Sequence, residues 1–273
     1  MGDKIVKTFI PKNFGRIAAQ TAKQVILQKL HEAERDNTLS EFSDKEGELM
    51  TGVIRKMDER NVYVELGDKK IEGVMPPQDR VATEKYAIGD TIKVFVKRVK
   101  NNGRNSQVVV SRTAQGLVKK LFEEQVPEIA QGVVEIKEIA REAGHRTKMA
   151  ILSSDVRVDA VGACVGNRGA RVNAVVEELG GEKIDIILWN EDPLAFIYKA
   201  LSPATVLSVT AKGEKSAVAI VPDDKLSLAI GRDGQNARLA ARLTGWKIDV
   251  KAESSPEAQE ILAQIENENS EEA

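Results

Sequence analysis

Two short segments of the chain pair glycines at a spacing suited to holding a phosphate group. Residues 166–169 read Gly-Asn-Arg-Gly, and residues 231–234 read Gly-Arg-Asp-Gly. Glycine lets the backbone turn sharply and lets another backbone approach it closely. A helix that begins directly after such a turn presents unpaired N–H groups and the positive end of its dipole, where a phosphate oxygen can bind. Each segment is therefore a candidate phosphate clamp.

A single Gly-x-x-Gly segment is weak evidence, because many helical hairpins turn at such a segment. Here the surrounding sequence repeats: residues 161–171 read VGACVGNRGAR, and residues 226–236 read LSLAIGRDGQN. Residues 181–186 (GEKIDI) match residues 245–250 (GWKIDV) in the same order. Two matching blocks in one order predict a duplicated α+β unit.

A Gly-x-x-Gly turn between two helices is the element with which a KH module clamps about four nucleotides of a single strand. We therefore predict that the chain binds single-stranded RNA at both turns and at polar side chains near them. The predicted RNA contacts are Gly166, Asn167, Arg168, Gly169, Arg171, Gly231, Arg232, Asp233, Gly234, Gln235, Asn236, Arg238, Lys247 and Tyr63.

The bases of the bound strand need an apolar groove beside each turn. Val165 and Val172 are the candidates in the first copy, and Ile230 and Leu239 are the candidates in the second. Asp233 places an acidic side chain inside the second turn, where it weakens phosphate binding.

Three aromatic residues have two interpretations each. Tyr63 alternates with two valines, so it faces outward either as a base-stacking residue or as surface packing. Trp189 and Trp246 flank predicted strands, where packing is a simpler interpretation than base stacking. Aromatic residues make up only 4% of the chain, which argues against an RRM, whose mechanism needs exposed stacking rings.

The net charge of −2 conceals an uneven distribution. Residues 253–273 contain seven acidic residues and no basic residue, which leaves 40 basic and 35 acidic residues (42 − 7) elsewhere. We predict that this acidic tail is disordered; a short helix around Ile261 and Leu262 is the alternative. The second repeat has more cationic residues than the first, so we expect it to attract RNA more strongly.

The periodicity of the chain predicts an α+β protein of several domains. Residues 14–35 have the three- and four-residue apolar spacing of one amphipathic helix, within a segment 1–45. Residues 46–113 form five short β-rich runs, with turns at Asp68 and at residues 101–103, which predicts a small OB barrel. The first KH domain is expected at 114–190, the second at 191–252, and the acidic tail at 253–273. Asp159 and Asp192 are the predicted N-caps of two helices.

Several classes of function are disfavoured by the composition. Cys164 is the only cysteine, and the two histidines, His31 and His145, are far apart, so neither an internal disulfide nor a Cys/His zinc site is expected. The sequence contains no apolar run of about 18 residues and no signal peptide. No catalytic constellation is apparent. We therefore expect a monomeric, non-enzymatic protein of the cytoplasm, without a cofactor.

The repeated blocks resemble one known family. Residues 161–189 (VGACVGNRGARVNAVVEELGGEKIDIILW) and 228–250 (LAIGRDGQNARLAARLTGWKIDV) are similar to the two KH signatures of the NusA family of bacterial transcription elongation, termination and antitermination factors. Residues 14–35 (FGRIAAQTAKQVILQKLHEAER) resemble the helix that joins the family's polymerase-binding domain to its barrel. The resemblance implies that residues 1–45 are a linker helix and a remnant of that domain.

The resemblance also implies an S1-type OB barrel followed by two tandem KH domains of the prokaryotic type (type II). It implies that the chain binds nascent RNA, has RNA polymerase as a partner, and modulates pausing, termination and antitermination. Two other hypotheses remain open. Polynucleotide phosphorylase also carries KH and S1-type modules, but with one KH domain before the barrel and a large catalytic core. A ribosome-associated KH protein is the other alternative.

Overall fold

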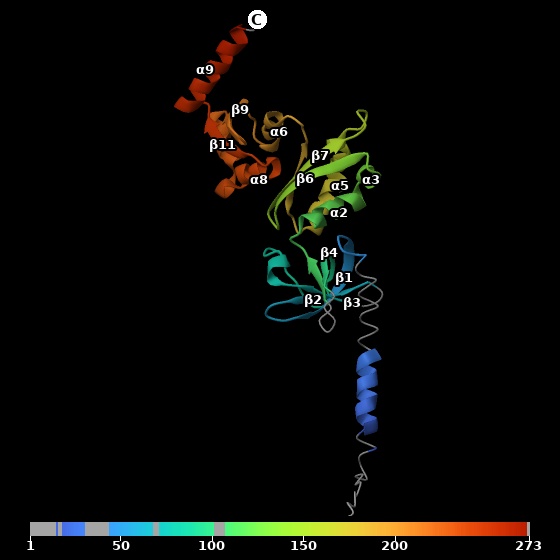
Figure 1. Ribbon diagram of the computed structural model, residues 1–273. Coiled ribbons are helices and arrows are strands. Elements are labelled where there is room, and N and C mark those ends of the chain that lie inside the picture. The colour runs from blue at the N-terminus through green and yellow to red at the C-terminus, as the bar shows by residue number, and fades with distance from the viewer. Residues whose placement is uncertain (1–14, 16–17, 31–43, 68–70, 101–106, 272–273) are drawn as a thin grey trace, which may run out of the picture.

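Residues 15, 18–30, 44–67, 71–100 and 107–271 are described by the computed structural model. Residues 18–30 are helical and exposed, and the rest of the helix predicted over 14–35 lies outside the described residues. The predicted turns at Asp68 and at residues 101–103 also lie outside them. Figure 1 shows a barrel followed along the chain by two further α+β units.

The apolar and polar residues that alternate along the first β-rich segment close into a five-stranded barrel. In β2, Val62, Val64 and Leu66 point into the barrel and are fully buried. A parallel pairing between β3 and β5 closes the sheet in the order β1-β2-β3-β5-β4. The strands are β1 (Leu49–Met57), β2 (Val62–Leu66), β3 (Ile71–Met75), β4 (Thr91–Lys100) and β5 (Gln107–Ser111). The predicted barrel is confirmed.

The first α+β unit has a three-stranded sheet in the order β6-β7-β8, in which β7 pairs antiparallel with β6 and parallel with β8. Its helices pack around one apolar cluster that includes Leu117, Phe122 and Val175. Its elements are α2 (Gln115–Gln125), α3 (Pro127–Ala130), β6 (Val134–Glu142), β7 (Arg146–Ser153), α4 (Ala160–Val165), α5 (Ala170–Glu178) and β8 (Lys183–Leu188).

The second unit repeats this arrangement, with a sheet in the order β11-β10-β9. It has the same order of elements: helix, two strands, two helices and strand. The elements are α6 (Pro193–Ala200), β9 (Ser208–Gly213), β10 (Ser216–Val221), α7 (Leu226–Ile230), α8 (Gln235–Thr244) and β11 (Lys247–Ala252). The duplicated α+β unit predicted from the sequence is confirmed.

Two aspartates begin helices as predicted. The side chain of Asp159 accepts a hydrogen bond from the Val161 amide at the start of α4, and Asp192 accepts from the amides of Leu194 and Ala195 at the start of α6. A capping carboxylate satisfies N–H groups that the helix leaves unpaired. These two helix starts are therefore closed to other acceptors.

The two units share one apolar core. Ala140, Ala150 and Ile187 of the first sheet belong to the same buried cluster as Phe196 of α6 and Leu239 of α8. Helix α8 lies against β6 (Figure 1). Because burial of apolar area is the main favourable term in folding, this shared core holds the two units together as one body.

A buried lysine adds a polar contact to the same seam. Lys148 of β7 is fully buried, and its Nζ donates to the Ser202 carbonyl in the second unit at 2.6 Å and to Asp185 Oδ2 at 3.0 Å. Burial lowers the pKa of Lys148, and the charge of Asp185 opposes that change. A buried ammonium without such acceptors is costly, so these contacts select one placement of the second unit.

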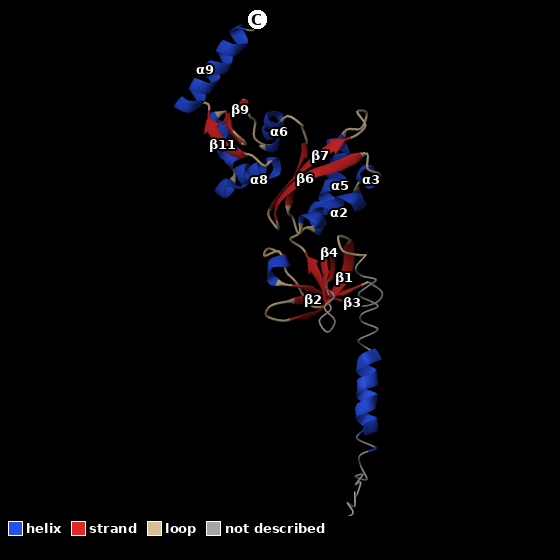
Figure 2. Cartoon of the chain, in the orientation of Figure 1, coloured by secondary structure: helices blue, strands red, loops and turns tan. Residues whose placement is uncertain are grey.

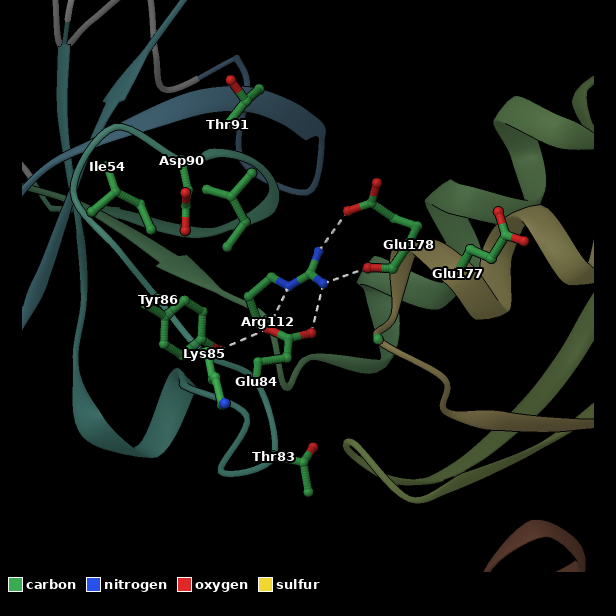
Figure 3. Close-up of a pocket in the computed structure, with 12 residues that line it drawn as sticks. Ile54, Thr83, Glu84, Lys85, Tyr86, Asp90, Thr91, Arg112, Glu177 and Glu178 are labelled. Atoms are coloured by element: carbon green, nitrogen blue, oxygen red, sulfur yellow. Dashed lines mark hydrogen bonds and ion pairs between the residues drawn. The ribbon is translucent and has the colours of Figure 1, made fainter.

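Arg112 connects the barrel to the first α+β unit (Figure 3). Its guanidinium donates to Glu84 Oε1 at 2.6 Å, to Glu178 Oε1 at 2.9 Å, and to the carbonyls of Lys93 and Glu178 at 2.8 and 2.6 Å. Burial acts to lower the pKa of Arg112, but the hydrogen bonds with the two glutamates raise it overall. Two of the acceptors belong to the barrel and two to α5, so the contact fixes one domain against the other.

The predicted disorder of the acidic tail is wrong. Residues 256–271 form helix α9 (Pro256–Glu271), which extends beyond β11 at the carboxyl end of the chain (Figure 2). Ala258 is fully buried against Val218 and Ile220 on the face of the second sheet, and Ile261 and Leu262 pack beside it. The charge of the segment suggested disorder, but this apolar stripe finds a sheet face to cover.

Within the described part of the chain, no helix has the length and apolar character needed to cross a membrane.

The Arg112 contact predicts a large loss of stability when it is removed. Arg112→Met leaves the carboxylates of Glu84 and Glu178 without their buried partner, so the free energy of unfolding should fall by about 3 kcal/mol. Urea denaturation followed by circular dichroism measures this. Arg157→Met, which breaks only the exposed pair with Asp155, is the control and should leave the midpoint unchanged. Equal midpoints for the two variants would contradict the role given to Arg112.

The packing of α9 gives a second prediction. Ala258→Glu forces a carboxylate between α9 and the second sheet, so the melting temperature should fall by several degrees. Gln259→Glu introduces the same side chain at the neighbouring exposed position and should leave the melting temperature unchanged. Differential scanning calorimetry measures both. If the two variants melt together, α9 does not pack on the sheet.

Candidate nucleic-acid interface

The two Gly-x-x-Gly turns have nearly the same backbone conformation. Gly166 has φ 72° and ψ 175°, and Gly231 has φ 76° and ψ 170°. The second glycines, Gly169 and Gly234, have φ 80° and 75° with ψ 11° and 13°. In each turn the amide of the second glycine donates to the carbonyl of the first at 3.1 Å. The sequence repeat is therefore a repeat of backbone geometry.

The first and second glycines are required for different reasons. The first lies in a region of positive φ and extended ψ that is essentially restricted to glycine. The second is in the left-handed helical region, which asparagine and aspartate also visit. A Cβ at Gly231 would lie 2.7 Å from the Asn236 backbone nitrogen, whereas a Cβ at Gly234 would meet only the end of the Arg238 side chain at 3.9 Å. The first glycine of the second turn has no substitute.

Helices α5 and α8 begin directly after these turns without a side-chain cap. Their N-cap residues are Gly169 and Gly234, which have no side chain to cap the helix, and the amides of Ala170 and Gln235 donate to the carbonyls of Asn167 and Arg232 within the turns. This differs from α4 and α6, which aspartates cap. Both helices have at least nine residues. A helix start of this kind can hold an anion between its amides and the positive end of its dipole.

The side chains inside both turns point to solvent. Asn167 and Arg168 are exposed. In the second turn the side chains of Arg232 and Asp233 are 95% and 88% exposed, and their charges are 3.6 Å apart. Arg168 and Asp233, at the same position of their turns, both have φ 52°, a conformation that aspartate tolerates better than arginine. Cationic side chains are thus available at both turns, with an acidic neighbour at the second.

Arg171, which the sequence analysis predicted as an RNA contact, braces the first turn. It is half-buried, and its Nη1 donates to the Ala163 carbonyl at 2.6 Å and to Glu128 Oε2 at 3.0 Å. A Cβ at Gly166 would lie 2.7 Å from the Arg171 Cγ. Its guanidinium is therefore already engaged within the first unit.

Two predicted contacts in the second unit face inward. Asn236 is only 2% exposed, and its Nδ2 donates to the carbonyls of Leu201 and Ala229 at 2.9 and 3.0 Å. Leu239, a predicted groove residue, is fully buried in the core that the two units share. Both predictions are corrected: on the inner face of α8, Asn236 binds carbonyls of the second unit itself and Leu239 packs into the core that the two units share. The other groove residues, Val165, Val172 and Ile230, are partly accessible.

Gln235 and Arg238, two further predicted contacts, bind Glu142 at the end of β6. Gln235 Nε2 donates to Glu142 Oε2 at 2.9 Å, and Arg238 Nε donates to Glu142 Oε1 at 2.7 Å. Arg238 Nη1 also donates to the Asp233 carbonyl inside the second turn, at 3.0 Å. The second turn is thereby connected through Arg238 to the first unit. Nothing in the sequence pattern identified Glu142, because its partners are more than 90 positions away.

The titration of Glu142 follows from these contacts. The hydrogen bond from Arg238 is the largest cause that lowers the pKa of this carboxyl below its ordinary value of 4.5. Because the pKa is lowered in the folded protein, the contact contributes fully above pH 4.5 and is lost as the pH falls through the lowered pKa. The connection between the second turn and the first unit is therefore complete at neutral pH.

The two remaining predicted contacts are at the surface. The Tyr63 hydroxyl donates to Asp58 Oδ2 at 2.8 Å, and the Lys56 ammonium is 5.1 Å from the centre of the Tyr63 ring. The hydrogen bond to Asp58 raises the pKa of Tyr63. Lys247, the first residue of β11, is exposed. Tyr63 is thus fixed on the outer face of the barrel, far in sequence from both turns.

A five-stranded barrel followed by two units of this topology, each with a Gly-x-x-Gly turn, defines a protein with an OB-type barrel and two tandem KH domains. Family models agree with this assignment. The model described as "NusA-like first KH domain" matches residues 112–189, and the "NusA-like second KH domain" matches residues 193–258. The model "NusA N-terminal domain" matches residues 1–36.

Curated relatives with the name "Transcription termination/antitermination protein NusA" are similar over most of the chain. The protein of Bacillus subtilis is 52% identical over 255 residues, covering 93% of this chain and 68% of its own length. That of Halalkalibacterium halodurans is 51% identical, covering 92% and 65%. That of Thermus thermophilus is 44% identical, covering 99% and 70%. The chain belongs to the NusA family, and it spans about two thirds of the length of these relatives.

The glycine geometry predicts unequal effects of two alanine substitutions in the second turn. Gly234→Ala introduces only the strain of positive φ, about 1–2 kcal/mol. Gly231→Ala adds a clash with the Asn236 backbone and should lower the melting temperature at least twice as far. Thermal unfolding followed by circular dichroism measures both variants. A Gly231→Ala protein that melts with or above Gly234→Ala would contradict this geometry.

Proposed function

We propose that the chain binds nascent single-stranded RNA at both turns and thereby modulates pausing, termination and antitermination by RNA polymerase. The observation that carries this proposal is the pair of uncapped helix starts behind Gly-x-x-Gly turns of the same conformation. Amides at each start bind one phosphate group, and the adjoining residues hold about four nucleotides. The chain acts as a monomeric binding protein in the cytoplasm, without catalysis.

The roles of the predicted contact residues now divide into two groups. Direct contact with RNA is proposed for the residues of both turns, for Lys247 on β11, and for Tyr63 as a separate contact on the barrel. A supporting role is proposed for Arg171, Gln235 and Arg238, because their side chains already bind protein groups. The direct contacts at the turns are Gly166, Asn167, Arg168, Gly169, Gly231, Arg232, Asp233 and Gly234.

The second partner that we propose is RNA polymerase. The names of the relatives associate them with transcription termination and antitermination. The match of residues 1–36 to the family's N-terminal domain supports this segment as the site of contact. Capture of purified polymerase by the chain, compared with a chain that lacks residues 1–45, tests this part of the proposal. Equal capture by both would place the polymerase contact elsewhere.

Reversing the charges inside the turns should weaken RNA binding. The triple variant Asn167→Asp, Arg168→Asp and Arg232→Asp places carboxylates where phosphates bind, so the dissociation constant for an unstructured RNA should rise at least tenfold. Fluorescence anisotropy at fixed salt measures it, with circular dichroism as the test of folding. If about four phosphates are bound, log K should fall with log salt at a slope of about −3 in the wild type and less steeply in the variant.

The control for a single charge reversal is Lys119→Asp, which changes the net charge by −2 on the exposed face of α2, outside both turns. It should leave the dissociation constant within about twofold of the wild type. A folded triple variant with wild-type affinity would show that the turns do not bind RNA. Equal weakening by the control would show that only the overall charge matters.

A further inference from the structure

Both tryptophans of the chain line one cleft at the seam between the two KH domains. The cleft has a volume of about 440 Å³, and Trp189, Trp246 and Phe196 form its aromatic walls. Asn190, Glu191, Glu138 and Arg242 supply its polar groups. A volume of this size is within the range of about 300–1,000 Å³ that is typical of small-molecule sites.

The two rings differ in what they already contact. The Trp189 ring lies 6.5 Å from the Phe196 ring at an interplanar angle of 54°, and the Lys137 ammonium is 5.7 Å from its centre. Within the described residues, Trp246 contacts neither another aromatic ring nor a cation. Trp246 is only partly buried. Both rings pack against the core that the two domains share, so Trp189 is a fixed wall and Trp246 presents its partly exposed side to the cleft.

The charges of the cleft favour a neutral ligand. Among the residues that line the cleft, two carboxylates, Glu138 and Glu191, oppose one cation, Arg242, whose side chain is 56% exposed and 3.8 Å from Glu142. The nearby Lys137 is paired with Glu135 at 2.7 Å. A phosphate group would be repelled by this balance. A flat, neutral ring with hydrogen-bonding edges suits it, because carboxylate and amide groups bind the amino and carbonyl groups of nucleobases. Asn190 Oδ1 accepts from the Asp192 amide, which leaves the Asn190 Nδ2 as a donor.

The cleft lies at the carboxyl end of α8 and beside the end of β7. Helix α8 begins at the second turn and ends in the cleft at Thr244 and Gly245. A helix of ten residues is about 15 Å long, so a strand held at the second turn passes the cleft within a few nucleotides. On the other side, the Trp189 amide donates to the Ile151 carbonyl near the end of β7, from which the chain continues to α4 and the first turn.

We propose that this cleft binds an unpaired nucleobase of the RNA segment between the two clamps, stacked on Trp246. Base–aromatic stacking on the exposed part of the Trp246 indole would add affinity without a phosphate contact. This inference rests on the proposed RNA binding by the two turns. It adds a base-binding position that neither Gly-x-x-Gly turn provides.

Tryptophan fluorescence reports on this cleft alone, because the chain contains no other tryptophan. Titration of the full chain with an unstructured 12-nucleotide RNA, at the red edge of tryptophan absorption, should quench the emission with the same midpoint as anisotropy of the labelled RNA. Trp246→Phe should retain binding, because it keeps an aromatic ring. Trp246→Ala should weaken binding about tenfold, the effect of losing one stacked base.

A series of the same RNA with a single abasic nucleotide at each position locates the base. In the wild type, one position should show a loss of about tenfold, and that loss should disappear in Trp246→Ala. Tyr198→Ala removes an aromatic side chain of α6 that is 46% exposed and outside the cleft, and it should behave as wild type. Circular dichroism and melting temperature establish that each variant is folded.

The outcomes separate this inference from the proposed function. RNA that binds with unchanged tryptophan emission, together with wild-type affinity of Trp246→Ala, would overturn the base site and leave the clamps in place. An abasic series in which every effect persists in Trp246→Ala would also overturn it, because bases bound beside the turns keep their effect but a base in the cleft does not. RNA that fails to bind even at low salt would overturn the proposed function and, with it, this inference.

Discussion

The positive φ of the first glycine in each turn is the constraint on which the interface depends. It ends one short helix, α4 in the first turn and α7 in the second. The next helix, α5 or α8, begins at the residue after the second glycine and has no side-chain cap. Only glycine adopts this combination of positive φ and extended ψ without a large conformational strain. Its result is a helix start that no side chain caps, beside exposed polar or cationic side chains. Within each turn the amide of the residue after the second glycine, Ala170 or Gln235, donates to the carbonyl of Asn167 or Arg232. The same geometry occurs twice, so the chain offers two equivalent positions for the backbone of one strand.

Two clamps act on one strand only if their separation is fixed. The shared apolar core, the Lys148 contact and the Glu142 contact all hold the second KH domain against the outer face of the first sheet. Arg112 holds the barrel against the other end of α5. Buried ionic contacts of this kind stabilise little by themselves, but removing one partner is costly, so they specify one arrangement over others. The rigidity of the RNA-binding surface therefore comes from groups that do not contact RNA.

The sequence predicted what local patterns determine. The barrel, the order of elements in both repeats, and the aspartate caps of α4 and α6 follow from periodicity and from the residues preferred at helix starts. The predictions that failed concern side chains whose burial depends on which other element of the fold packs against their helix. Asn236 is buried against the end of α6 and against α7 of its own domain, and Leu239 lies in the core shared with the first domain. The apolar stripe of α9 around Ala258 covers a face of the second sheet, which the charge of the tail does not indicate. A pattern of single residues does not indicate a partner surface more than 90 positions away, as for Glu142.

Amide chemical shifts measure most directly whether backbone amides at both turns bind phosphate. In ¹H–¹⁵N spectra of the isotopically labelled chain, saturation with a short single-stranded RNA should move the amides of Arg168 through Arg171 and of Asp233 through Gln235 further than those of the capped starts of α4 and α6. Tight RNA binding that leaves both sets of turn amides unmoved, with the shifts confined to the barrel, would contradict the account.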